Sequence, residues 1–192
     1  MDVELLVTMG EVLNFTFRIL PSATWDDVRP FFQHLNEVNQ PKYSQEFYST
    51  DEVMIPYYGK HGAKQIIRGK PICFGFKVWA ACTANGFLLH AEPYYGSHTN
   101  VPDTGLGHGP NVVMELVKQI NLHTGQHVVF DNLFTSVPLL KNLGDQGIGA
   151  TGTMRVDRLS GAPVMAKKDM EKKTRGYMEE AFTGCIYTRG QK

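Results

Sequence analysis

Residues 128–136 read Val-Val-Phe-Asp-Asn-Leu-Phe-Thr-Ser, a short β-branched and aromatic run that ends in the carboxylate of Asp131. A polar turn follows, and Ser136 is a residue type that begins helices by accepting a hydrogen bond from a backbone N–H group. In a parallel α/β sheet, ligands bind beyond the carboxyl ends of the strands. The pattern therefore predicts a strand over 127–130, with Asp131 at its carboxyl end.

A second carboxylate, Asp51, lies in a comparable β-forming run over 47–55. Two further β-forming runs, 72–82 and 87–95, flank Ala84-Asn85-Gly86, and Asn-Gly is a hairpin-turn signal because these residues tolerate positive φ. After the third strand, the sequence predicts a helix that Asn111 caps and Gly125 ends. A second helix is predicted from Ser136 to Gly144, with Pro138 in its first turn. A strand over 148–154 follows this helix.

The predicted order is β-β-β-α-β-α-β. Short turns join the first three strands into an antiparallel meander, and helices then connect parallel strands, which makes a mixed α/β (α+β) sheet with helices on its faces. This is the order of the ribonuclease H-like fold. The first and fourth strands are neighbours in that fold, so we predict that Asp51 and Asp131 face one another.

Composition is that of an ordinary globular domain. The chain has 192 residues, 42% of them hydrophobic, and its formal net charge is zero, so any contact with nucleic acid must come from a local basic face. Its three cysteines, Cys73, Cys82 and Cys185, lack the spacing of a zinc site or a disulfide framework, which favours a reducing compartment. The sequence predicts neither a signal peptide nor a membrane span.

The residue composition and the predicted local structure change along the chain. Residues 1–24 show no clear pattern. Residues 25–46 predict a helical lead-in that starts near Trp25, with Ser22 or Thr24 as its cap and Pro30 as a kink or restart. Residues 47–154 form the predicted core. Residues 155–192 are basic, are interrupted by Gly and Pro, and hold one more predicted strand over 181–188; we interpret them as the truncated start of an inserted β-rich region.

The two aspartates have a functional and a structural interpretation. Mg²⁺ prefers carboxylate, water and phosphate ligands, and phosphodiester chemistry commonly uses two such ions. Alternatively, Asp131 only forms an Asx-turn before the helix, and Asp51 is a solvated residue at the edge of a strand. The histidines show no metal-ligand spacing.

Basic side chains gather in two places. The loop over 57–70 carries Lys60, Lys64, Arg68 and Lys70, and Arg155 begins the basic segment over 155–175. We predict that these residues contact the DNA backbone, and the alternative is a solvated charged surface.

Several motifs together resemble the catalytic domain of piggyBac-type transposases. They are Thr50-Asp51-Glu52, Tyr58-Gly59-Lys60, the run from Lys70 to Trp79, the run from Asp131 to Leu140, and Gly152-Thr153-Met154-Arg155. The upstream run from Arg29 to Asn36 resembles the segment that enters this domain. The likeness covers roughly residues 25–190 and is strongest to transposase-derived proteins that vertebrate genomes have domesticated.

The resemblance implies cut-and-paste DNA chemistry of the DDD/DDE type. Asp51 matches the first catalytic aspartate and Asp131 the second, with Mg²⁺ or Mn²⁺ as cofactor, DNA as partner and the nucleus as location. The full-length family also suggests a possible homodimer. The family's third aspartate lies beyond the inserted region, and neither Asp157 nor Asp169 matches it.

Two functions therefore remain open. The first is a metal-dependent DNA strand transferase. The second is a non-catalytic, domesticated module that binds DNA weakly or binds another protein. Because one of three metal ligands has no match, we predict that this chain is inactive in catalysis.

Overall fold

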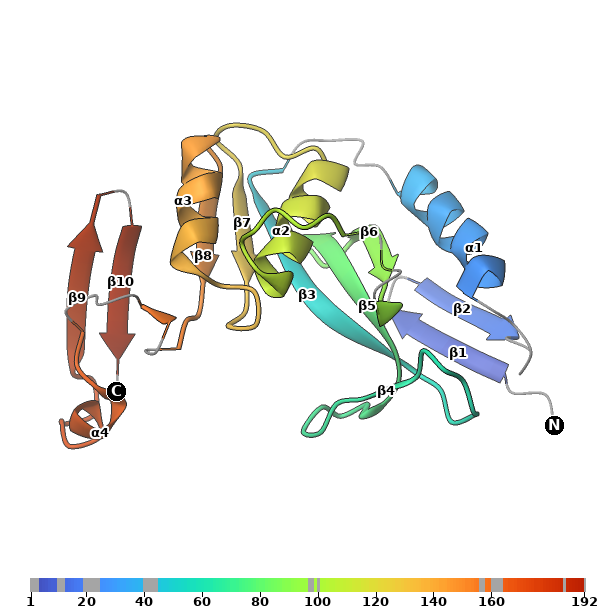
Figure 1. Cartoon of the computed structure of the whole chain (residues 1–192), viewed down its shortest axis with the longest axis horizontal. Helices are drawn as coiled ribbons and strands as arrows, with labels where there is room; N and C mark the ends of the chain where they lie inside the picture. Colours follow the sequence, from blue (N-terminus) through green and yellow to red (C-terminus); the bar gives the residue numbers. More distant parts are fainter. Residues whose placement is uncertain are drawn as a thin grey trace.

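The computed structural model describes residues 4–9, 13–18, 25–39, 45–96, 99, 101–155, 158–159, 164–184 and 186–191. Its centre is a six-stranded mixed sheet, in which five strands follow the order β4-β5-β3-β7-β8 and β6 pairs with β5 (Figure 1). The sheet strands are β3 (Phe47–Pro56), β4 (Gln65–Ile66), β5 (Phe74–Thr83), β6 (Leu88–Pro93), β7 (His127–Phe130) and β8 (Gly149–Gly152). The helices are α1 (Trp25–Val38), α2 (His108–Gln119), α3 (Val137–Asp145) and α4 (Lys167–Met170).

The sheet is antiparallel in its first half and parallel in its second. Strand β5 pairs antiparallel with both β3 and β6, and the turn between β5 and β6 contains Gly86 at φ +80°, as the Asn-Gly signal predicts. Strand β3 pairs parallel with β7, which pairs parallel with β8. The prediction that the first and fourth strands of the core are neighbours is therefore confirmed, since these strands are β3 and β7.

Helices cover the two faces of the sheet unequally. Helices α2 and α3 pack on one face against a core that includes Trp79, Val128 and Phe130. Helix α1 packs through Phe32 and Leu35 on the other face, over β5 and β6 (Figure 1). On that second face, Phe47 remains 45% exposed and Val129 on β7 remains 41% exposed.

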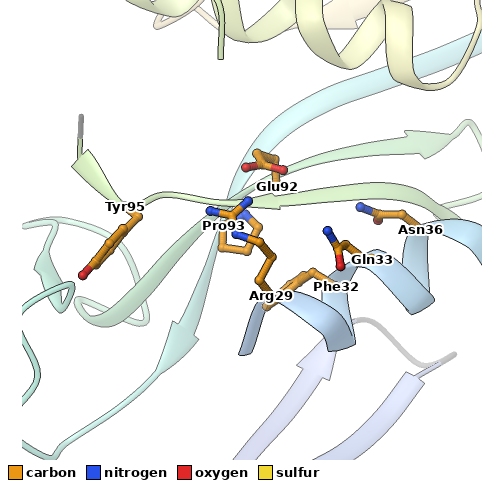
Figure 2. A pocket seen from close by; sticks show the side chains of 7 residues that line it. All are labelled: Arg29, Phe32, Gln33, Asn36, Glu92, Pro93 and Tyr95. Carbon is orange, nitrogen blue, oxygen red and sulfur yellow. The ribbon is translucent and has the colours of Figure 1, made fainter. Parts of the chain in front are cut away.

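Helix α1 also closes one edge of the sheet. Among the described strands, β6 pairs only with β5, so its outer backbone groups need other partners. Asn36 points from α1 toward β6 and makes two hydrogen bonds with the backbone of Ala91 (Figure 2). An edge strand protected in this way is not free to pair with another chain.

Several local predictions are confirmed and several are wrong. Strand β7 has the predicted bounds, and the Ser136 hydroxyl accepts the hydrogen bond from the Leu139 N–H that caps α3. Helix α1 starts at Trp25 as predicted, and Pro30 lies inside it without ending it. The loop over 57–70 contains the short strand β4, which the sequence does not predict.

The predicted cap of α2 is wrong. The helix is capped at Gly107, four residues earlier, begins at His108, and ends at Gln119 rather than at Gly125. Asn111 is buried inside the helix, where its amide group accepts from Thr104 and donates to the Asp103 carboxylate. Asn111 therefore fixes the preceding loop instead of capping the helix.

The two ends of the chain form hairpins. Strands β1 (Glu4–Met9) and β2 (Leu13–Arg18) pair antiparallel near the N-terminus. The single strand predicted over 181–188 is instead a hairpin of β9 (Met178–Thr183) and β10 (Ile186–Gln191), with Gly184 at φ +54° between them. The predicted caps at 22 and 24 and the cysteine at 185 lie outside the described residues. The proposed domain boundaries stay predictions.

No described helix has both the length and the apolar character needed to span a membrane.

Candidate metal centre

The fold brings Asp51 and Asp131 to adjacent positions on neighbouring strands. Thr50 on β3 pairs with Phe130 on β7 in parallel register, and each aspartate is the next residue of its strand or chain. Adjacent strands lie about 4.8 Å apart, and side chains at matching positions point to the same face. Both aspartates are exposed, on the face where Phe47 and Val129 are also exposed. The register therefore gives Asp51 and Asp131 adjacent positions, as the predicted strand order requires.

One oxygen of each carboxylate is held by a backbone N–H group. Oδ1 of Asp51 accepts from the N–H of Glu52 at 2.7 Å, and Oδ1 of Asp131 accepts from the N–H of Leu133 at 2.8 Å. The hydrogen bond from Leu133 closes an Asx-turn, which the structural interpretation of Asp131 predicts. This turn is compatible with a metal-binding role for the same carboxylate. A carboxylate fixed through one oxygen still offers its remaining lone pairs to a cation.

The donor set fits part of a divalent-metal site. Two exposed carboxylates of like charge suit a hard cation that takes oxygen ligands. Within the described ranges, no group of three His, Cys, Asp or Glu side chains gathers to hold a metal. Cys82 lies on the same face near Asp51, but burial, and to a lesser degree Asp51, raises the pKa of its thiol, so a thiolate ligand is disfavoured. The described residues thus offer two carboxylates as candidate ligands.

The turn that carries Asp131 is tightly supported. Thr135 is fully buried, and its hydroxyl donates to the carbonyl oxygen of Asp131 at 2.6 Å. Helix α2 packs directly against the turn, because a Cβ atom at Gly109 would lie 2.5 Å from the Leu133 carbonyl oxygen. At Gly152 on β8, a Cβ atom would clash with the Thr135 hydroxyl and the Phe130 ring. Two glycines therefore permit the close packing that fixes the position of Asp131.

Glu52 points to the opposite face and pairs with a predicted DNA contact. Lys70 Nζ lies 3.3 Å from Glu52 Oε1, and the Glu52 side chain is only 10% exposed. Lys77, on β5, stacks its ammonium group over the Tyr94 ring at 4.1 Å. Burial lowers the pKa of Lys77, while the nearby Glu52 carboxylate opposes this effect. Part of the charge of Lys70 is therefore engaged in an internal ion pair.

The other predicted DNA contacts lie on two separate segments of the chain. Lys60 and Arg68 are exposed in the loop around β4, and Arg155 is exposed three residues after β8 (Figure 1). Lys64 is half-buried, donates to the Gly59 carbonyl at 3.0 Å and lies over the Phe74 ring. Arg155 thus follows the carboxyl end of β8, whereas the loop that carries the other three cations lies beside β5, at the opposite edge of the sheet. DNA binding by these cations stays a prediction.

Two residues with contacts to Glu52 or to the Asp131 turn were not predicted from the sequence. Lys77 interrupts an apolar strand, and a single charge in such a run is a sequence signal of a specific contact. Arg158 donates from Nη1 to the carbonyl oxygen of Asn132 at 2.8 Å. No sequence pattern predicts this contact, because its partner is a backbone group 26 residues away.

Comparisons with known proteins identify the family of this chain. A family model described as Transposase IS4 matches residues 20–190. The human PiggyBac transposable element-derived protein 3 is 38% identical over 167 residues, which cover 85% of this chain and 28% of that protein. The human PiggyBac transposable element-derived protein 2 is 37% identical over 153 residues, which cover 78% of this chain and 26% of that protein.

The chain therefore spans about a quarter of the length of these two relatives. A cryo-EM structure of a piggyBac transposase synaptic complex with hairpin DNA matches this chain with a TM-score of 0.73 and 22% sequence identity. The match covers 88% of this chain and 35% of the solved chain, and it shows a shared fold, which is ribonuclease H-like. The chain accordingly belongs to the IS4-type transposase family, among the proteins derived from piggyBac transposable elements.

Proposed function

We propose that Asp51 and Asp131 together bind a divalent cation, Mg²⁺ or Mn²⁺, beside a DNA backbone held by basic side chains. The observation that carries this proposal is the register of β3 and β7, which sets two exposed carboxylates side by side on one face. Two like charges held this close destabilise each other unless a cation lies between them. The proposal includes a nuclear location, because chromosomal DNA is there.

The proposed roles of the side chains follow from their positions. The metal, when bound, polarises a phosphodiester group and activates a nucleophile. The backbone N–H groups of Glu52 and Leu133 orient the two carboxylates. Lys60, Lys64, Arg68 and Arg155 neutralise phosphates on either side, and Lys70 contributes less because Glu52 already pairs with it.

A non-catalytic DNA-binding module is the second candidate. It is favoured by the number of ligands, because only two carboxylates gather at the site among the residues that the structure describes. In-line phosphoryl chemistry requires both ions to be positioned, so we expect metal and DNA binding by this chain with little or no strand cleavage.

The test is a Mn²⁺ titration of the ¹⁵N-labelled chain followed by NMR. Paramagnetic broadening is expected to begin at the amides near Asp51 and Asp131, and Asp131→Asn is expected to abolish it. The matched control is Asp145→Asn, which removes an exposed carboxylate at the end of α3. Broadening that is unchanged in Asp131→Asn would refute the metal site.

A parallel assay with hairpin DNA and Mn²⁺ separates the two candidates. Strand cleavage that disappears in Asp131→Asn shows a strand transferase, whereas binding without cleavage shows the non-catalytic module. Binding itself should weaken steeply with salt concentration, because it rests on contacts between cations and phosphates.

A further inference from the structure

One peptide group connects Arg158 to the Asp131 carboxylate. Arg158 Nη1 donates to the carbonyl oxygen of Asn132 at 2.8 Å and lies 3.5 Å from that of Leu133. The N–H of Leu133 donates to Asp131 Oδ1 at 2.8 Å. The Asn132 carbonyl and the Leu133 N–H belong to the same planar peptide unit. Arg158 therefore holds the oxygen end of the peptide whose nitrogen end holds the carboxylate.

This arrangement constrains the orientation of the carboxylate. A peptide group at the tip of a turn can rotate, and rotation would swing the Leu133 N–H away from Asp131. A guanidinium group on the carbonyl oxygen opposes that rotation, because the oxygen would lose a charge-assisted hydrogen bond. The same contact polarises the peptide and strengthens its N–H as a donor, as in other chains of hydrogen bonds.

The other supports of the turn do not supply this constraint. The Thr135 hydroxyl and the Thr135 N–H both donate to the carbonyl oxygen of Asp131, one peptide earlier. Gly109 packs against the Leu133 carbonyl, one peptide later. Arg158 bonds to the peptide between them, and it comes from the segment that follows β8.

We propose that Arg158 is a positioning residue that orients the Asp131 carboxylate through the Asn132–Leu133 peptide. The conformation of the segment after β8 is thereby coupled to the geometry of the carboxylate pair. The consequence for metal affinity rests on the function proposed above, whereas the local constraint on the turn does not.

The experiment compares Arg158→Gln and Arg158→Lys with Lys141→Gln in the full chain. Lys141 is an exposed cation on α3 with no proposed role in metal or DNA binding, so its variant controls for loss of charge. The first readout is amide hydrogen exchange by NMR without metal. In Arg158→Gln, the Leu133 amide is expected to exchange about three- to tenfold faster, the effect of losing one hydrogen bond. Amides within β3 should keep their rates, which separates this effect from general destabilisation.

The second readout is Mn²⁺ affinity, measured by paramagnetic broadening. Arg158→Gln is expected to weaken it by about three- to tenfold, Arg158→Lys to restore part of the loss through its single remaining donor group, and Lys141→Gln to change neither readout.

Each outcome is decisive. Unchanged Leu133 exchange in Arg158→Gln overturns the proposal, as does an equal acceleration in Lys141→Gln. Loss of DNA affinity in Arg158→Gln with unchanged Leu133 exchange would identify Arg158 as a phosphate contact instead. If the unmodified chain binds no Mn²⁺, the proposed function fails, and the Leu133 exchange rate alone decides the role of Arg158.

Discussion

The amide side chain of Asn36 on α1 forms a reciprocal pair of hydrogen bonds with the backbone of Ala91 on β6. The Ala91 N–H donates to Asn36 Oδ1 at 2.8 Å, and Asn36 Nδ2 donates to the Ala91 carbonyl at 3.1 Å. Ala91 is fully buried, so water cannot replace either bond. One side chain thus joins the helical lead-in to the edge of the central sheet.

Replacing Asn36 by Leu should therefore lower the free energy of unfolding by about 1–3 kcal/mol, because two buried backbone groups lose their partners. Asn36→Asp keeps the acceptor for the Ala91 N–H but sets a second carboxylate oxygen against the Ala91 carbonyl, so it should also destabilise the fold at neutral pH. Urea unfolding measures both variants, with the exposed Gln33→Ala on the same helix as the control. An Asn36→Leu variant as stable as the control would show that the contact contributes nothing.

Replacing either Asp51 or Asp131 by Asn should increase the stability of the fold. Without metal, Asp131→Asn should raise the free energy of unfolding by about 0.2–1 kcal/mol, because it removes a like charge opposite Asp51. The Asn side chain still accepts from the Leu133 N–H, so the turn is retained. Asp51→Asn should give a similar gain, and the double variant less than the sum, because both changes relieve one repulsion. Additive gains in thermal unfolding would show that the carboxylates do not interact.

Much of this site could be predicted from local sequence. The bounds of β7, the Ser136 cap and the hairpin at Gly86 depend on residues within a few positions of one another. The register of Asp51 with Asp131 follows from the order of the elements, since strand order determines which strands are neighbours.

The contacts that refine the site could not be predicted in this way. Asn36 meets Ala91 across 55 residues, and Arg158 meets Asn132 across 26 residues. Both bind backbone groups, which are the same at every position and leave no trace in the sequence. Asn111 was misplaced for a related reason: its side chain suits a helix cap, but the loop before it supplied other partners.

Substitution of Gly109 by Ala should have two opposing effects on the free energy of unfolding. Gly109→Ala improves helix propensity in α2 by up to about 1 kcal/mol. The added Cβ atom, however, would lie 2.5 Å from a backbone carbonyl, which cannot move freely, and overpacking of this kind costs about 1–3 kcal/mol. We expect net destabilisation in urea unfolding and weaker Mn²⁺ binding. Gly62→Ala is the control, because no atom lies within 4 Å of its added Cβ.

Substitutions at Lys60 and at Lys70 should affect different properties, DNA binding for Lys60 and stability for Lys70. Lys60→Gln should reduce the salt dependence of DNA binding by about one unit of slope and leave stability within about 0.5 kcal/mol. Lys70→Gln should lower stability by about 1 kcal/mol, because the largely buried Glu52 loses its ion-pair partner, and should change the salt slope less. Fluorescence anisotropy and urea unfolding of both variants test this. Reversed effects would place Lys70, not Lys60, at the DNA.

His90 should make the fold sensitive to mild acid. Burial lowers the pKa of His90 in the folded chain, with the Glu115 carboxylate opposing, so the unfolded chain binds the proton more tightly. The contribution of His90 to the free energy of unfolding is therefore fully present above the pKa of the unfolded chain, about 6.5. It falls as the pH drops from there toward the lower pKa of the folded chain. His90→Gln should flatten the decrease between pH 7.5 and pH 5, measured by urea unfolding. Some decrease should persist, since burial and Lys77 also lower the pKa of His108. The exposed His123→Gln is the control, and an equal flattening there would exclude His90 as the source.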